Sequence, residues 1–286
     1  MLGLFVSFLA AFSQATKDIY SKHLLKEGDE YVVSFATIFF TLPFLAVLVV
    51  ALPVPSLGSS FFQALITGAV LFTAGFILWT KALKHSDISA TIPLIAFTPV
   101  FTLFTSPFIQ GEFPSTIGLG GVLLVVAGSY VLNLKRAAEG WLVPFKALLH
   151  EHGPRTMLLA VLIISVAGNI DKVGVNNSSP LFWLFSINVL ISALMLVLML
   201  YKSKNVNHLR THWKELSLLG FIMAVNQVFH IIAVSLTLVA YVFSIKRLSI
   251  LISVLAGHYF FKEKDVKQKL SGSIIMVLGV VLIVLA

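Results

Sequence analysis

The sequence contains no cysteine and few charged residues. Without cysteine among its 286 residues, the chain has no disulfide, no thiolate nucleophile and no sulfur ligand for a metal. Charged side chains make up only 11% of the sequence, whereas soluble domains have about 25%. The HExxH, GxSxG and P-loop motifs are also absent, so nothing indicates ATP-driven transport or hydrolysis. We therefore expect no cofactor, no metal and no enzymatic activity.

Apolar residues, by contrast, are abundant: 58% of the chain is hydrophobic and the mean hydropathy is +0.98. They form runs of 17 or more residues, which as helices are long enough to cross a bilayer. The predicted fold class is an all-α polytopic membrane protein, multi-pass in the cell (inner) membrane, with the lipid bilayer as its partner. Ten transmembrane helices are predicted, approximately at 2–22, 31–52, 60–82, 87–108, 115–134, 156–175, 180–201, 214–236, 240–261 and 270–286.

Among the predicted loops, only alternate ones contain lysine or arginine. The loops after the first, third, fifth, seventh and ninth predicted helices are basic, and the intervening loops carry neither residue. By the positive-inside rule the basic loops are cytoplasmic, so both termini are expected outside. The net charge of +8 therefore reports orientation, and no nucleic-acid partner is expected.

The two halves of the chain match each other in pattern. A shift of 151 residues places Glu112 on Glu263, and a shift of 155 places Gln14 on Asn169 and Lys17 on Lys172. The first shift also superimposes two polar stripes, namely Thr98, Thr102 and Ser106 on Ser249, Ser253 and Gly257. Five helices is an odd number, so the two halves must cross the membrane in opposite senses.

Inverted repeats place a binding site near the midplane of the membrane, at the interface of the repeats. The predicted organisation is a first repeat at 1–134, a cytoplasmic connecting loop at 135–155 and a second repeat at 156–286.

Two segments carry a resemblance to a known family. They are TIPLIAFTPVFTLFTSPFIQGE, which ends at Glu112, and IKRLSILISVLAGHYFFKE, which ends at Glu263. A glycine-punctuated helix follows each, and together they resemble the EamA family of the drug/metabolite transporter superfamily. The resemblance implies two inverted five-helix repeats and secondary transport of small metabolites or drugs. The implied cavity is lined by helices one, three, four, six, eight and nine. Family members are generally drawn with cytoplasmic termini, whereas these loop charges favour termini outside.

Lys246 and Arg247 lie inside the predicted helix 240–261. A charge there costs about 2.5–3.5 kcal/mol to insert near the membrane centre. We expect Lys246 to face a polar cavity, because small and polar residues follow it on one helical face, at Ser249, Ser253 and Gly257. Arg247 is followed on its own face by apolar residues, so it is a weaker candidate. The alternative is that both side chains snorkel to the headgroups.

Asp171 is predicted at nearly the same depth, about 7 Å from the outer boundary against about 9 Å for Lys246. An ion pair from Asp171 to Lys246 or Arg247 is therefore one hypothesis, and it would serve as a gate. Lys17 and Asp18 lie toward the cytoplasmic end of the first helix, and Lys172 toward the outer end of the sixth. The two lysines either line the two mouths of the pathway or anchor their helices at the interface.

Uncharged polar residues supply further candidates. Asn226, Gln227 and His230 lie in the predicted helix 214–236, and Gln14 and Asn169 correspond under the repeat. Each either contacts substrate or holds neighbouring helices together.

The stripe of Thr98 and Thr102 points to the same cavity as Pro99, whose ring frees a carbonyl in the same helix. Trp79 is interpreted as an interfacial anchor, Glu112 as a cap or dipole partner of the next helix, and the repeated glycines as packing faces.

The function predicted from these features is secondary transport by alternating access around a central polar cavity. The cationic residues favour an anionic or zwitterionic metabolite, which the protein exports, and the protein is expected as a monomer or homodimer. The alternative is an intramembrane enzyme or a flippase that acts on lipid-linked substrates.

Overall fold

The computed structural model describes residues 2–25, 28–85, 94–95, 97–132, 152–203, 206–249 and 266–286, and within them the regular secondary structure is entirely helical. Five spans in this part of the chain are long and apolar enough to cross a membrane: Glu30–Val50, Phe61–His85, His152–Asn176, Pro180–Lys202 and Trp213–Leu236. A polytopic helical membrane protein is thus confirmed, while the full number of ten spans stays a prediction.

The helices follow the predicted spans over much of the chain. In order they are α1 (Leu2–Leu25), α2 (Glu30–Phe39), α3 (Leu42–Val50), α4 (Phe61–His85), α6 (Thr98–Gln110), α7 (Thr116–Leu132), α9 (His152–Asn176), α10 (Pro180–Lys202), α11 (Asn207–Thr211), α12 (Trp213–Leu236), α13 (Val239–Lys246) and α15 (Val266–Leu285). Most of the predicted helix 240–261 beyond residue 249 lies outside the described residues, as does most of the beginning of the predicted helix 87–108.

The predicted helix 31–52 is divided into α2 and α3. Pro43 has no N–H to donate to the carbonyl of Phe39, so the α-helical hydrogen bonding is interrupted there. The hydroxyl of Thr41 donates to the carbonyl of Thr37 at 2.8 Å and to that of Gly220 in α12 at 3.0 Å. The break thereby joins this span to α12, and periodicity alone did not reveal it.

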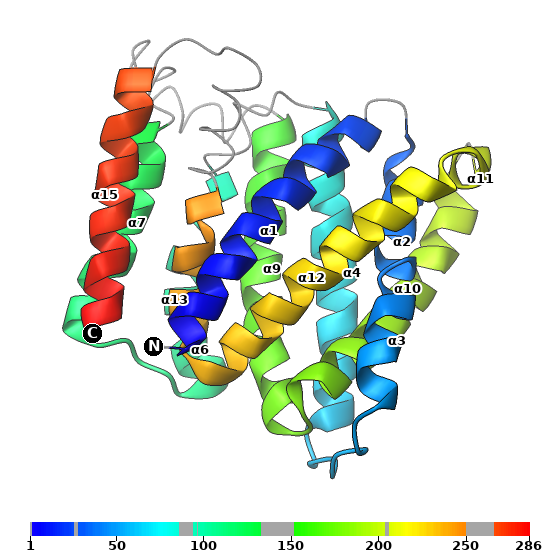
Figure 1. Ribbon diagram of the computed structural model, residues 1–286, viewed down its shortest axis with the longest axis horizontal. Coiled ribbons are helices and arrows are strands. Elements are labelled where there is room, and N and C mark those ends of the chain that lie inside the picture. Colours follow the sequence, from blue (N-terminus) through cyan, green and yellow to red (C-terminus); the bar gives the residue numbers. More distant parts are fainter. Residues whose placement is uncertain are drawn as a thin grey trace.

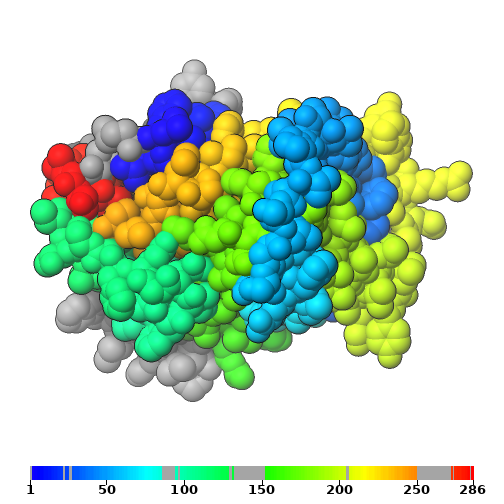
Figure 2. Space-filling model, turned by 90° about the horizontal axis from the view of Figure 1, so that it is seen from below, coloured from blue at the N-terminus to red at the C-terminus, as the bar shows by residue number. Residues whose placement is uncertain are grey.

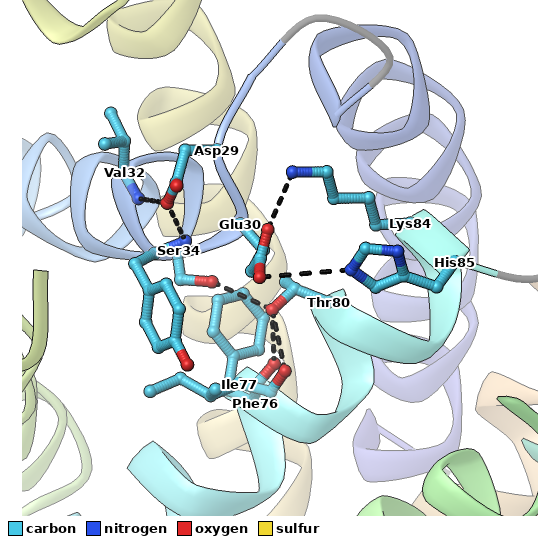
Figure 3. Close-up of polar contacts among 10 residues, drawn as sticks. Asp29, Glu30, Val32, Ser34, Phe76, Ile77, Thr80, Lys84 and His85 are labelled. Atoms are coloured by element: carbon cyan, nitrogen blue, oxygen red, sulfur yellow. Dashed lines mark hydrogen bonds and ion pairs between the residues drawn. The ribbon is translucent and has the colours of Figure 1, made fainter. Parts of the chain in front are cut away.

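The beginning of α2 is fixed against the end of α4 (Figure 3). The side chain of Asp29 caps α2 by accepting a hydrogen bond from the backbone N–H of Tyr31 at 2.8 Å. Glu30 forms an ion pair with Lys84 at 2.7 Å, and the hydroxyls of Ser34 and Thr80 lie 3.0 Å apart. These contacts lie within the first half of the chain.

Three helix pairs pack along their lengths: α1 with α12, α4 with α9, and α7 with α15. Figure 1 shows α7 beside α15 at one side of the molecule and α1 running beside α12 across it. In each pair one helix precedes residue 135 and the other follows residue 151. The two halves therefore interlock, and the space at the centre is bounded by side chains from both.

Glycines allow α7 and α15 to approach closely, as predicted. A Cβ on Gly121 would lie 2.6 Å from the carbonyl oxygen of Gly279, and a Cβ on Gly128 would lie 2.6 Å from the backbone nitrogen of Met276. Backbone atoms cannot move aside as a flexible side chain can. The contact therefore requires glycine at both positions.

We expect Gly128→Ala to lower the melting temperature of the purified protein, because the added methyl group overpacks the helix contact at a cost of about 1–3 kcal/mol. Gly120→Ala is the matched control in the same helix, since a Cβ there meets nothing within 4 Å. Its melting temperature should stay the same or rise, because alanine favours the helix over glycine. Equal melting temperatures for the two variants would contradict the close contact.

Candidate functional site

A cavity lies between the two halves, lined from α1, α4, α6, α9, α10, α12 and α13. The volume within which the centres of water molecules can lie is about 110 Å³. One water molecule requires about 10–15 Å³ on the same measure. Several waters or a small metabolite therefore fit. Its polar and ionisable lining consists of Gln14, Lys17, Thr98, Asp171, Asn188, Asn226, Gln227, His230, Lys246 and Arg247.

Lys246 and Arg247 both line the cavity and are buried, with exposed fractions of 7% and 6%. Helix α13 ends at Lys246, and Arg247 is its C-cap, with its backbone N–H bonded to Ser244. Arg247 keeps αR backbone angles and lines the cavity together with Lys246, so it is a stronger candidate than its apolar followers in the sequence suggested. The Nε of Arg247 donates to the carbonyl of Phe243 at 3.3 Å. Neither cation has a carboxylate within 4.0 Å in the described part of the chain.

Asp171 lines the same cavity but does not form the predicted ion pair. Its carboxylate accepts a hydrogen bond from the indole N–H of Trp183 at 3.0 Å, and no nitrogen of Lys246 or Arg247 lies within 4.0 Å of it. Depth along the membrane does not fix lateral separation, and the tryptophan of α10 satisfies the acid instead. The hypothesis of a gate at this pair is therefore not realised in this conformation.

Lys17 lies at the cavity, buried at 7% exposure, and is therefore not an interfacial anchor. Its ammonium forms an ion pair with Asp18 at 3.1 Å. The side-chain amide of Gln14 donates to both oxygens of Asp18 at 2.9 Å. The charge of Lys17 is therefore balanced on its own helix.

Trp79 was interpreted as an interfacial anchor, and this was wrong. Trp79 is buried, with an exposed fraction of 9%, and lines the cavity. The ammonium of Lys17 lies 5.9 Å from the centre of its ring. A tryptophan near a helix end has the same sequence context at the lipid interface and at a cavity. Only the packing of α4 against α1 and α9 distinguishes the two.

Lys172 lies outside the cavity lining and is paired with Glu112. Its ammonium also donates to the carbonyl of Thr237 at 2.9 Å. The interpretation of Glu112 as a helix cap was likewise wrong, because the hydroxyl of Ser115 accepts the backbone N–H of Gly118 at the start of α7. The side chain of Glu112 instead turns toward α9, where it meets a cation.

The polar residues of α12 divide into two roles. The amide of Asn226 donates to the carbonyl of Ala10 at 3.0 Å and to the hydroxyl of Ser13 at 3.1 Å, and so joins α12 to α1. Gln227 and His230 also line the cavity, but Gln227 Oε1 and His230 Nδ1 are buried without a hydrogen-bond partner among the described residues. These two side chains are available to a ligand, whereas Asn226 is already engaged.

Asn169 holds helices together and does not line the cavity. It is fully buried, its Oδ1 accepts from Ser106 at 2.6 Å, and its Nδ2 donates to Thr105 at 2.8 Å. Thr98 lines the cavity, whereas the hydroxyl of Thr102 is bonded to the carbonyl of Thr98 within α6.

The second polar stripe is described only in part. Ser249 is buried at 5% exposure, and Ser253 lies outside the described residues. Sequence reasoning missed Asn188, which lies on α10, fully buried, and lines the cavity with its Oδ1 unpartnered. A single amide in an otherwise apolar helix is the signal that would have indicated it.

The known proteins similar to this chain include a curated plant protein and a solved structure. A segment of 90 residues is 30% identical to phosphoenolpyruvate/phosphate translocator 2, chloroplastic, of Arabidopsis thaliana. The match covers 32% of this chain and only 24% of the length of that relative. A solved crystal structure has a similar fold, with a TM-score of 0.75. The superposition covers 99% of this chain and 96% of the chain in that structure. The sequence identity is 14%, so this likeness shows a shared fold alone.

The family comparison covers most of the chain. The model of the EamA-like transporter family matches residues 1–134 and 153–285. The predicted resemblance is thereby confirmed. So is the prediction that the protein is not an enzyme, because the family is described as one of transporters. This chain belongs to the EamA-like transporter family.

Proposed function

We propose that the protein is a secondary transporter that moves small anionic or zwitterionic metabolites by alternating access around the central cavity. One observation carries the proposal. Lys246 and Arg247 are adjacent and buried at the cavity, and no described carboxylate lies within 4.0 Å of either.

Charge compensation favours an anion as the ligand. A buried charge without a close partner is costly, and among the described cations at the cavity only Lys17 has a carboxylate within 4.0 Å, that of Asp18. Asp18 and Asp171 act on Lys246, and Asp18 on Arg247, only over longer distances. A phosphate or carboxylate between Lys246 and Arg247 would form charge-assisted hydrogen bonds, for which a guanidinium is well suited. Asp171 lines the same cavity and offers a carboxylate to an ammonium group, so zwitterions belong to the same proposal.

The named relative supports this substrate class. The Arabidopsis thaliana protein is called a translocator of phosphoenolpyruvate and phosphate, both of which are small anions. We propose a substrate of the same charge here, with the cation pair as the common requirement.

The packing of the helices supports two inverted five-helix repeats and ten spans. If the halves are equivalent, α1 corresponds to α9 and α4 to α12. The contact of α1 with α12 then corresponds to that of α9 with α4, and both are extensive. The contact of α6 with α9 likewise corresponds to that of α13 with α1. The match of the family model to residues 1–134 and 153–285 agrees with this relation, and inverted repeats are a common basis of alternating access.

The charges of the loops support a proposal on the orientation of the protein in the membrane. Lys202 and Lys214 are exposed, one at the end of α10 and the other at the beginning of α12. We propose that this end faces the cytoplasm and that the protein lies in the inner membrane.

Inorganic phosphate or phosphoenolpyruvate should raise the melting temperature of the purified protein by several degrees. Binding at 100 times Kd stabilises the folded state by about 2.7 kcal/mol. Lys246→Met should abolish most of that rise. Without ligand this variant should be at least as stable as the wild type, because it removes an uncompensated buried charge.

Lys202→Met is the matched control, because Lys202 is exposed at the end of α10 and does not line the cavity. It should retain the full stabilisation by both anions. The proposal fails if the anions stabilise Lys246→Met as strongly as the wild type.

A second pair of variants separates binding from packing on α12. Asn226→Ala removes contacts to α1 and should reduce stability by about 1 kcal/mol with little change in anion affinity. Gln227→Ala removes a side chain whose Oε1 has no partner, so it should change stability little. Because Oε1 only accepts, the hydrogen bond lost is one that the ligand donates, such as that of the P–OH group of hydrogen phosphate, and binding of phosphate should weaken roughly threefold to tenfold. Calorimetric titration and thermal unfolding measure the two effects, and the opposite assignment would contradict these roles.

A further inference from the structure

We propose that the ion pair between Glu112 and Lys172 is a gate that closes the cavity at the end of the molecule where α9 terminates. The inference rests on the alternating access proposed above. It adds the specific contact whose separation opens this end.

The ion pair joins the two halves of the chain. Glu112 lies between α6 and α7, and Lys172 lies one turn before the end of α9. The same ammonium donates to the carbonyl of Thr237, the C-cap of α12, at 2.9 Å. One side chain therefore connects a segment of the first half to two helices of the second.

The pair is positioned beside the cavity. Asp171 lines the cavity, and Lys172 is the next residue toward the end of α9. In the rocking motion of inverted repeats, the two halves separate at one end while they close at the other. Opening of this end requires Glu112 to move away from Lys172, because they belong to different halves.

Burial makes this contact more than a surface ion pair. The side chain of Lys172 is 12% exposed and that of Glu112 is 17% exposed, so salt screens their attraction only weakly. The other carboxylate oxygen, Glu112 Oε2, is buried and has no hydrogen-bond partner in the part of the chain that the structure describes. The carboxylate of Glu112 is thus held through Lys172. In an open state water would hydrate both groups, and in the closed state each needs the other.

Further polar contacts between the halves lie along the same side. The amide of Gln110 donates to the carbonyl of Asn169 at 2.6 Å, in addition to the contacts of Asn169 with Thr105 and Ser106. At the turn after α9, the backbone N–H of Gly58 donates to the carbonyl of Asn177 at 2.9 Å. The bonds of Asn169 align α6 with α9 and so bring Glu112 within reach of Lys172, and the bond of Gly58 joins the loop between α3 and α4 to the end of α9.

Figure 2 views the molecule from this end. The segment between α6 and α7, coloured teal, lies against the end of α12 and the green surface of α9 and α10, with no evident opening between them on this face.

The natural absence of cysteine allows a direct test. Ala167 lines the cavity and Ser59 is exposed in the loop beside Asn177, so Ala167→Cys reports access to the cavity and Ser59→Cys identifies the face. Each is labelled with a membrane-impermeant maleimide in sealed vesicles of both orientations. From the Ser59 face, Glu112→Gln should increase labelling of Ala167→Cys at least tenfold. The exchanged pair, Glu112→Lys with Lys172→Glu, should restore slow labelling.

Glu30→Gln is the matched control, because it breaks the similarly buried ion pair of Glu30 with Lys84, which lies within one half (Figure 3). It should leave the labelling rate within twofold of the parent. The gate is refuted if Glu112→Gln also stays within twofold, or if the exchanged pair labels as fast as Glu112→Gln. If Glu112→Gln does not fold, Lys172→Gln is read by the same criteria.

The labelling experiment uses no substrate, so it is independent of the proposed anion site. Loss of anion binding in the thermal assay would refute the substrate class and leave the labelling result standing. Unchanged labelling would refute the gate and leave the substrate class standing.

Discussion

The structure depends on how charged side chains are compensated in an apolar interior. The cations at or beside the cavity fall into three sets, and each is compensated differently. Lys17 is balanced by Asp18 on its own helix, and Lys172 by Glu112 from the other half of the chain. Lys246 and Arg247 are buried with no carboxylate within 4.0 Å in the described part. Because a charge without a close partner is expensive there, this pair is the basis of the proposed ligand site, whereas the other two sets form structural contacts.

Close packing determines where that site can form. Helices of the two halves alternate in space, so the central cavity belongs to both, and a ligand in it senses their relative position. Amide side chains contribute to this arrangement in two ways. The side chains of Asn226 and Asn169 form hydrogen bonds between helices. The side-chain oxygens of Gln227 and Asn188 have no hydrogen-bond partner among the described residues and lie at the cavity. The first pair holds the frame and the second is available for recognition.

The neighbouring residues Asp171 and Lys172 connect the proposed site to the proposed gate. On a helix, successive side chains differ in direction by about 100°, so one of two adjacent residues faces the cavity while the other faces a neighbouring segment. Here Asp171 lines the cavity and Lys172 meets Glu112. A shift of α9 that accommodates a ligand at Asp171 would therefore also be felt at the ion pair. This coupling needs no intermediary beyond the helix itself.

The sequence by itself determined the class of protein, most helix positions, the glycine contacts and the presence of Lys246 at a polar cavity. These follow from apolar length, glycine spacing and the cost of a charge in lipid, all of which are local properties. Only the tertiary structure decided which charges meet. It paired Lys172 with Glu112, left Asp171 to Trp183, placed Trp79 inside, and brought Asn188 to the cavity. The physical reason is that periodicity and depth fix position along one helix, whereas contact between side chains depends on the lateral packing and rotation of several helices.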